Sequence, residues 1–264
     1  MLPMISDDKH FTLRLAQDDR DLRAAQRLRY EVFVQELGAT GGLIDHDTRL
    51  ERDEFDPFFD HLLLIDPLRS AEDLQDVVGV YRLLPSDRLA VTGRFYSESE
   101  FDLTALKASG RKLLELGRSC VHADYRGGTA MLLLWNALAD YVLEHGIEVL
   151  FGAASFHGTD MAALAQPLSY LQHFHLAPPE LRVIARPAQT AQFAMIPQDS
   201  LDRKAAMLAT PALIKAYLRL GGYVGQGAWV DHAFNTTDVC LVMDTAQMSA
   251  KHRDFYIRKS GREA

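Results

Sequence analysis

The chain of 264 residues has a globular composition, with 48% hydrophobic and 24% charged residues. This mixture excludes long-range disorder, a collagen-like repeat and a small disulfide scaffold. Its 36 acidic and 28 basic residues give a net charge of −8, which argues against a protein that coats nucleic acid. Neither Cys120 nor Cys240 belongs to a CxxC or a metal-ligand pattern, so we expect two buried, reduced thiols and no metal site.

The sequence predicts a cytoplasmic protein. Residues 1–10 lack the basic and then apolar segments of a secretory signal. No apolar run reaches the roughly 18 residues that a membrane-spanning helix needs. A basic cluster near the C-terminus either keeps that segment in solution or meets anionic lipid headgroups, which leaves peripheral contact with the inner face of the membrane open. The cluster consists of Lys251, Arg253, Arg258, Lys259 and Arg262.

Apolar alternation and short apolar runs predict strands, and longer periodic segments predict helices. Residues 39–60 are expected to form a structured loop, because three phenylalanines anchor an otherwise acidic segment. The order of elements is typical of an α/β (α+β) fold, in which helices cover both faces of a twisted mixed sheet. In chain order, we expect strands at 11–16, 61–65, 77–84, 112–121, 147–153 and 228–242, and helices at 20–37, 129–145, 161–173 and 211–220.

A turn containing Gly127 and Gly128 leads from a predicted strand into the long helix over 129–145. Free backbone N–H groups at the start of a helix attract a phosphate or a pyrophosphate. Adjacent glycines before a helix are also ordinary turn geometry. The residues of this turn therefore leave both interpretations open.

The segment VHADYRGGTAMLLLW at 121–135 resembles the acyl-donor loop of N-acyltransferases of the GNAT superfamily. Four more motifs occur in register, and together they resemble both acyl-homoserine-lactone synthases and the ornithine N-acyltransferases that make lyso-ornithine lipid. The segments at 155–175 and 211–239 favour the ornithine enzymes, since the lactone synthases are shorter. The four motifs are LRYEVFVQELG at 28–38, RDEFDPFFDHLLLI at 52–65, GVYRLLP at 79–85 and LELGRSCV at 114–121.

This resemblance implies a single GNAT-like acyltransferase domain over 1–264, with a C-terminal extension from about residue 205 to 264. It implies that a (3-hydroxy) fatty acyl chain passes from acyl carrier protein to the α-amino group of L-ornithine, the first step of ornithine lipid biosynthesis. No cofactor would stay bound, and acyl-phosphopantetheine would be a co-substrate. The glycine spacing after Arg126 departs from the family pattern, which favours a carrier protein over coenzyme A as donor.

Two other functions remain open from the sequence. One is an acyl-homoserine-lactone synthase that uses acyl carrier protein and S-adenosylmethionine. The other is an inactive module that binds lipid or carrier protein. A hydrolytic triad is not expected from Ser155, His157 and Asp160, because the GxSxG elbow is missing.

Acyl transfer to an amine needs a proton acceptor, and an amino-acid acceptor offers an ammonium and a carboxylate to bind. The resemblance assigns Glu115 as the base, acting directly or through water, and Arg118 as organiser of the acidic cluster. These two residues have opposite parity along their strand, so an irregularity near Gly117 would have to bring them to one site. A structural ion pair is the alternative. The predicted catalytic residues are Glu115, Asp56 and Arg118.

Arg29 would lie on an apolar helix face and needs an acidic partner, for which the aspartate loop is the natural source. For Asp53 and Asp56 the alternative is a solvated loop, for Arg82 it is surface exposure, and for Tyr170 it is core packing. The predicted substrate-binding residues are Arg29, Phe33, Asp53, Arg82 and Tyr170, and the predicted acyl-donor-binding residues are Val121, Arg126, Gly127 and Gly128.

Overall fold

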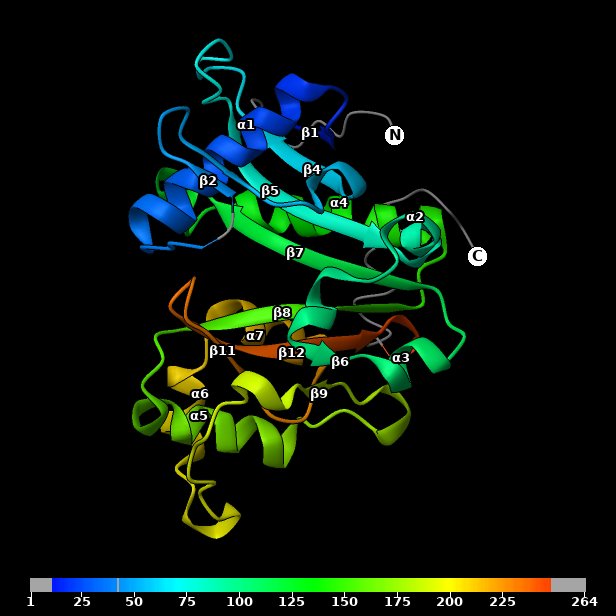
Figure 1. Cartoon of the computed structure of the whole chain (residues 1–264), viewed down its shortest axis with the longest axis vertical. Helices are drawn as coiled ribbons and strands as arrows, with labels where there is room; N and C mark the ends of the chain where they lie inside the picture. The colour runs from blue at the N-terminus through cyan, green and yellow to red at the C-terminus, as the bar shows by residue number, and fades with distance from the viewer. Residues whose placement is uncertain (1–10, 42, 248–264) are drawn as a thin grey trace. The chain divides into compact units, whose positions relative to one another are not determined.

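The computed structural model describes residues 11–41 and 43–247 (Figure 1). They form two compact units, each assembled from two stretches of chain. The first unit holds the described residues up to Arg88 together with Leu116–Gly146, and the second holds Leu89–Glu115 together with the described residues from Ile147 onward. The basic cluster between 251 and 262 lies outside the described residues. Within the described part of the chain, every helix is too short or too polar to cross a bilayer.

The first unit is built on strands in the order β1-β4-β5-β7. Strand β4 runs antiparallel to both β1 and β5. Helix α1 continues directly into a π-helical segment at Tyr30–Glu36, and the β2–β3 hairpin follows. The bounds are β1 Thr12–Leu15, α1 Asp19–Arg29, β2 Leu43–Asp45, β3 Leu50–Arg52, β4 Asp60–Ile65, β5 Val77–Pro85, β7 Leu113–Val121 and α4 Ala130–His145.

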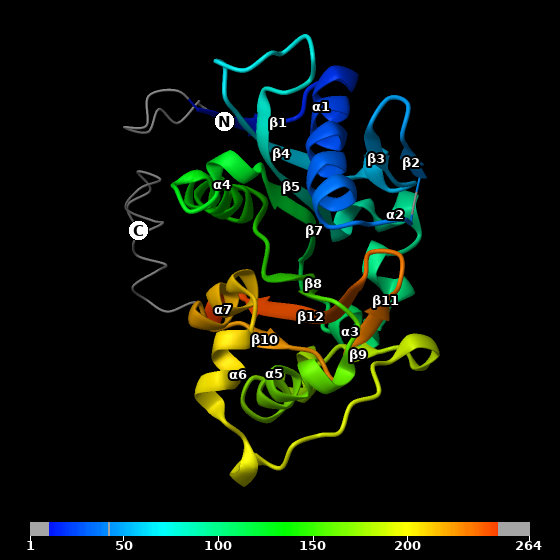
Figure 2. The same cartoon turned by 90° about the vertical axis from the view of Figure 1, so that its left-hand side faces the viewer.

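Helices α1 and α4 cover opposite faces of the sheet in the first unit (Figure 2). On the α1 side, Leu28 packs into a core with Leu63 and Val80. On the α4 side, a Cβ atom at Gly79 would lie 3.0 Å from the Leu134 side chain. The absence of a side chain at position 79 thus lets the long helix lie close against β5.

The second unit has a mixed sheet. The first residues of β7 run parallel to β8, from Leu113 opposite Val149 to Glu115 opposite Phe151. Strand β12 is antiparallel to β8, and both β10 and β11 pair with β12. The bounds are α2 Leu89–Thr92, β6 Phe101–Asp102, α3 Thr104–Ala108, β8 Val149–His157, α5 Met161–Phe174, β9 Ile184–Ala185, α6 Arg203–Ala209, α7 Ala212–Arg219, β10 Tyr223–Val224, β11 Trp229–Asp231 and β12 Thr236–Asp244.

The predicted mixed sheet and its covering helices are confirmed, with differences in detail. The helix expected over 20–37 changes to π geometry after Arg29, so the Leu37 N–H reaches back to the Val32 carbonyl. The expected loop at 39–60 contains the β2–β3 hairpin, whose three-residue strands are too short for a periodic signal. Helix α6 was not predicted, although Asp202 caps it. The single domain with a C-terminal extension stays a prediction.

Candidate active site

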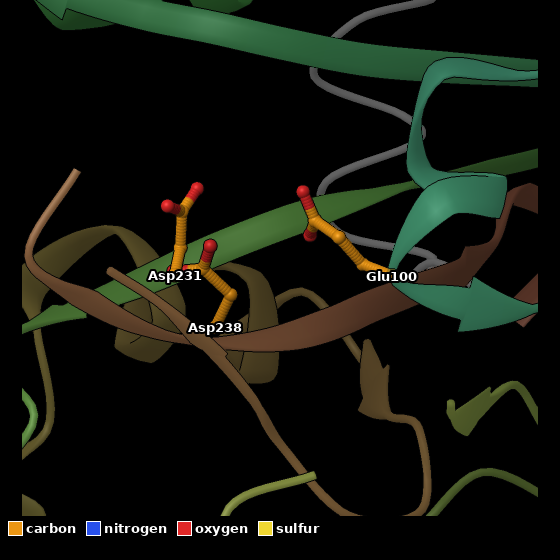
Figure 3. Close-up of side chains that lie close together, drawn as sticks. All are labelled: Glu100, Asp231 and Asp238. Carbon is orange, nitrogen blue, oxygen red and sulfur yellow. The ribbon is translucent and has the colours of Figure 1, made fainter. Parts of the chain in front are cut away.

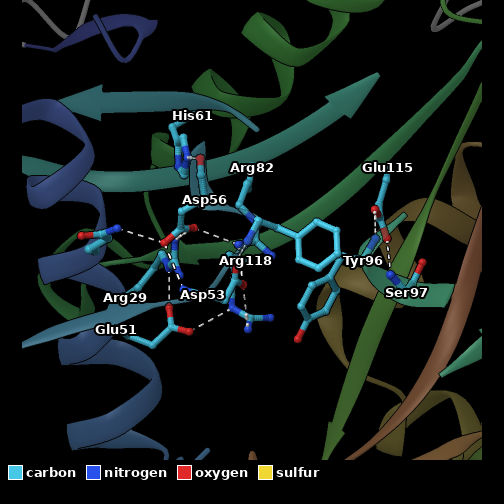
Figure 4. A network of polar contacts seen from close by, with 12 residues as sticks. Arg29, Glu51, Asp53, Asp56, His61, Arg82, Tyr96, Ser97, Glu115 and Arg118 are labelled. Atoms are coloured by element: carbon cyan, nitrogen blue, oxygen red, sulfur yellow. Dashed lines mark hydrogen bonds and ion pairs between the residues drawn. The ribbon is translucent and has the colours of Figure 1, made fainter. Parts of the chain in front are cut away.

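Six charged side chains from distant stretches meet inside the first unit (Figure 4). They come from the end of α1, from β3, from the loop after β3, from β5 and from β7. Three are guanidinium groups and three are carboxylates, so their formal charges sum to zero. The six residues are Arg29, Arg82, Arg118, Glu51, Asp53 and Asp56, and we call them the arginine–carboxylate network.

Arg29 lies at the centre of this network, and its side chain is fully buried. Its Nη1 lies 2.6 Å from Asp56 Oδ1, and its Nε donates to Glu51. A buried guanidinium needs such partners, because an unpaired charge costs several kcal/mol or more away from water. The expectation that the aspartate loop supplies the partner is confirmed. The sequence interpretation missed Glu51.

Arg82 is also fully buried, so the alternative of surface exposure is wrong. Its Nη1 lies 2.6 Å from Asp53 Oδ2 and 2.9 Å from Asp56 Oδ1. Its guanidinium carbon stands 4.1 Å from the centre of the Phe59 ring. The loop after β3 is therefore held to β5 by charge and by a cation–π contact.

Arg118 has a left-handed backbone with a φ of 49° inside β7. An L-residue adopts this conformation only when its surroundings impose it, and it interrupts the alternation of side chains along the strand. Nε of Arg118 lies 3.3 Å from Glu51 Oε1, and Nη2 lies 3.4 Å from Asp53 Oδ2. The irregularity expected near Gly117 thus falls one residue later. Arg118 contacts the acidic cluster, and its catalytic role stays a prediction.

The electrostatics keep Glu51 and Asp56 ionised. Burial alone would raise the pKa of Glu51, but the charges of Arg29 and Arg118 outweigh it and lower the pKa to about 2. Burial is likewise overcome at Asp56, whose pKa is held well below its usual range by Arg29 and Arg82. An acid so strongly paired takes up no proton near neutral pH. Asp56 thus holds the two arginines in place, and its catalytic role stays a prediction.

The network reaches solvent at one end. The side chains of Arg29, Glu51, Asp56 and Arg82 are at most 2% exposed, whereas Asp53 is 11% exposed and Arg118 is 13% exposed. Arg29 and Arg82 are therefore screened from solvent by their partners, and their roles toward a substrate stay predictions. One carboxylate and one guanidinium remain accessible, side by side.

Glu115 lies on β7 within the second unit and is 2% exposed. Its two carboxylate oxygens accept hydrogen bonds from the backbone N–H groups of Tyr96 and Ser97, at 2.8 and 2.7 Å (Figure 4). The carboxylate is more deeply buried than the sequence interpretation assumed, and it anchors the start of the 3₁₀ turn at Tyr96–Ser99. Its role as a base stays a prediction.

The predicted acyl-donor loop begins at Val121 and ends at α4. Gly127 has a φ of 76°, which glycine adopts without strain, and Gly128 follows it. Arg126 donates from Nε to the Val121 carbonyl at 2.9 Å, and its Nη2 lies 2.6 Å from Glu36 Oε2. Arg126 thereby braces the loop from within. Binding of an acyl donor by these residues stays a prediction.

Two of the predicted substrate-binding residues are aromatic, and neither is among the six residues of the arginine–carboxylate network. Phe33, in the π-helical segment, packs half-buried against the core beneath α1. Tyr170, on α5, has its hydroxyl 3.2 Å from His175 Nε2 and its ring against Phe174. Their roles toward a substrate stay predictions.

Comparison with known proteins extends these observations. The acetyltransferase (GNAT) domain matches residues 28–136. An L-ornithine N(alpha)-acyltransferase of Rhodobacter capsulatus is 64% identical over 94% of this chain and 95% of its own length. One from Brucella abortus is 38% identical over 95% of this chain and 90% of its own length.

Solved structures share the fold at low sequence identity. An N-acyl amino acid synthase from uncultured soil microbes has a TM-score of 0.51 at 12% identity, over 94% of this chain and all of that one. A CoA-dependent acyl-homoserine lactone synthase has a TM-score of 0.50 at 15% identity, over 92% of this chain and 83% of that one. Fold and domain together define an acyltransferase of the GNAT class. Within that class, the chain belongs to the L-ornithine N(alpha)-acyltransferase family.

Replacing Glu51 by Gln should destabilise the fold, because Arg29 would keep its charge in a fully buried position with one partner neutralised. We expect a loss of roughly 3–5 kcal/mol in the free energy of unfolding, measured by urea denaturation. Glu31→Gln is the matched control, since its ion pair with Arg27 is partly exposed and worth less than about 1 kcal/mol. Equal losses in the two variants would contradict the central role of the network.

His61 should make stability depend on pH. Burial first, and then the charges of Arg29 and Arg82, lower its pKa from 6.5 to about 4, while its Nε2 donates to the Asp56 carbonyl. Below pH 6.5 the unfolded chain binds a proton that folded His61 refuses, so stability falls as the pH drops toward 4. Between pH 7.5 and 5 we expect the wild type to lose about 2 kcal/mol more than His61→Gln in urea unfolding. Parallel pH curves for the two proteins would rule this out.

Proposed function

We propose that this protein transfers a (3-hydroxy) fatty acyl chain from acyl carrier protein to the α-amino group of L-ornithine, which yields lyso-ornithine lipid. Membership of the L-ornithine N(alpha)-acyltransferase family supports the reaction and the acceptor. The observation that carries the proposal is the way the arginine–carboxylate network ends: Asp53 and Arg118 stand side by side as its accessible groups. A cytoplasmic location belongs to the same proposal.

Asp53 and Arg118 suit the two charged ends of an amino acid. A carboxylate attracts the acceptor's α-ammonium, and a guanidinium binds a carboxylate with paired hydrogen bonds. The buried part of the network supports both groups, because Arg82 fixes Asp53 and Glu51 fixes Arg118. The acceptor would thus meet two oppositely charged groups that are already oriented, which reduces the ordering cost of binding.

The reaction forms one amide C–N bond and breaks one thioester C–S bond, without a covalent intermediate on the protein. The α-amine must lose a proton before or during attack. We assign this proton to Glu115, acting through a water molecule because the carboxylate is 2% exposed. The departing thiolate takes up a proton, for which Tyr170 is the proposed donor.

The acyl donor belongs at the turn from Val121 to Gly128. Phosphate of a phosphopantetheine arm suits backbone N–H groups at the start of α4, where Thr129 offers no side-chain cap. The arm would come from acyl carrier protein as a co-substrate, with no cofactor resident in the enzyme.

Purified protein should convert acyl carrier thioester and ornithine into free thiol and amide in equal amounts. Asp53→Asn should lower kcat/KM for ornithine at least about 100-fold, because it removes the accessible carboxylate. Asp47→Asn, at an exposed position of the β2–β3 hairpin, is the control and should keep full activity. Absence of thiol release would refute the proposal, and release with S-adenosylmethionine in place of ornithine would support a lactone synthase instead.

Glu115→Gln should reduce kcat/KM about 100-fold or more near neutral pH, within the range of a general base. Raising the pH should recover part of this loss, because the acceptor amine then deprotonates without help. Thermal unfolding of the variant checks that the Tyr96–Ser97 turn still forms. A loss that is the same at every pH would assign Glu115 a structural role and withdraw it as the base.

A further inference from the structure

Helices α6 and α7 collect positive charge on the surface of the second unit. Arg203 and Lys204 begin α6, and Lys215 and Arg219 lie on α7. Among the residues that the structure describes, none of these four side chains forms an ion pair with an acid. Their charges are therefore available to a partner outside the chain.

Other basic side chains of this unit are neutralised. Lys107 Nζ lies 3.0 Å from Glu98 Oε2, and Arg111 Nη2 lies 2.6 Å from Asp244 Oδ1. An exposed ion pair contributes little to stability, but it cancels the field that an approaching partner would meet. The four cations of α6 and α7 keep that field.

The acids of the unit are concentrated on other elements. Glu100, Asp231 and Asp238 each offer one carboxylate oxygen within 4.8 Å of the others, from β11, from β12 and from the residue before β6 (Figure 3). The sequence has no acidic residue between Asp202, which caps α6, and Asp231. A chain with a net charge of −8 thus holds a long segment whose charges are all positive.

The exposed face of α6 combines a cation with an apolar side chain. Ala206 is fully buried and marks the inner face of the helix. Lys204 and Leu208 are one turn apart and lie opposite Ala206. Leu208 is 72% exposed, so it adds almost nothing to the core. The preceding residue, Arg203, is held with its guanidinium carbon 4.2 Å from the centre of the Phe174 ring.

Helix α7 directs its apolar side inward and its cations outward. Ile214 and Tyr217 are its buried residues. Lys215 and Arg219 are one turn apart on the opposite side of the helix. Arg219 is exposed and Lys215 is half-buried, so the charged ends of both side chains reach water.

The two helices meet in a fixed corner. Thr210 is 1% exposed, and its hydroxyl donates to the Ala206 carbonyl at 2.9 Å. Pro211 follows directly and restricts the backbone where α7 begins. Figure 2 shows α6 and α7 on the same side of the unit. We call the side chains of this corner the α6–α7 patch, which consists of Arg203, Lys204, Leu208, Lys215 and Arg219.

We propose that the α6–α7 patch docks on a lipid bilayer that carries anionic headgroups. Each Lys or Arg near such a surface strengthens binding roughly fivefold. The Leu208 side chain gains by leaving water for the boundary between headgroups and acyl chains. Long basic side chains around an apolar one are typical of a surface that lies on a membrane, which favours a bilayer over an acidic protein as the partner.

This docking does not depend on the proposed acyl transfer, but it suits the proposed product. A lyso-ornithine lipid carries a long acyl chain and a charged head, so it passes from water into a bilayer. An enzyme held at the bilayer would release such a product where it is soluble.

Sedimentation of the full chain with lipid vesicles tests the proposal. Binding should be strong with vesicles of phosphatidylcholine and phosphatidylglycerol, weak with phosphatidylcholine alone, and should decline as salt is raised. Lys215→Gln combined with Arg219→Gln should weaken binding to the anionic vesicles roughly 30-fold, because two cations are lost. Leu208→Ser, which changes no charge, should weaken it at least about 5-fold.

Two variants in the first unit are matched controls. Arg23→Gln removes an exposed cation of α1, and Leu68→Ser removes a leucine that is 76% exposed. Both controls should bind the anionic vesicles as the wild type does. Thermal unfolding checks that every variant keeps its fold.

Equal binding of the wild type to both kinds of vesicle, or binding to neither, would overturn this inference. Patch variants that bind as well as the wild type would assign the contact to another segment, such as the basic cluster between 251 and 262, and would overturn it too. A raised KM for acyl carrier thioester in the double variant, with unchanged vesicle binding, would identify an acidic protein as the partner instead. All three outcomes leave the acyltransferase proposal intact.

Discussion

The pairing of the buried Arg29 guanidinium with Glu51 and Asp56 is the interaction on which the site in the first unit depends. A guanidinium at zero exposure persists only with full neutralisation, because desolvation of the charge costs several kcal/mol or more. The partners are drawn from the β3 strand and from the loop that follows it. The demand for neutrality therefore decides where this acidic segment lies on the sheet.

Once Arg29 is placed, the remaining positions of the network follow from the same balance of charge. Asp56 is shared between Arg29 and Arg82, and Glu51 is shared between Arg29 and Arg118. Every buried charge has a partner of opposite sign, and the chain of pairs ends at Asp53 and Arg118. A site organised in this way is held rigidly where it is buried and presents polar groups where it reaches solvent.

The charged side chains of the second unit are grouped differently. Its group of Glu100, Asp231 and Asp238 combines three acids at close range, whereas the network in the first unit is neutral. The GNAT domain match covers residues 28–136 and so includes the network and Glu100, but Asp231 and Asp238 lie beyond it.

The sequence by itself determined the main strands, the long helix, the family and most members of the site. Helical and strand periodicity are local properties, and a buried Arg29 demands an acid whatever the fold. The three arginines carry one more charge than the two aspartates of the loop can balance. This imbalance indicated a third acidic residue and could have pointed to Glu51. Only the tertiary structure decided which glutamate is the third acid. It also decided how deeply Glu115 is buried and that Glu100 lies close to Asp231 and Asp238. Those features depend on side chains far apart in the chain, whose proximity is set by strand register and not by any local pattern.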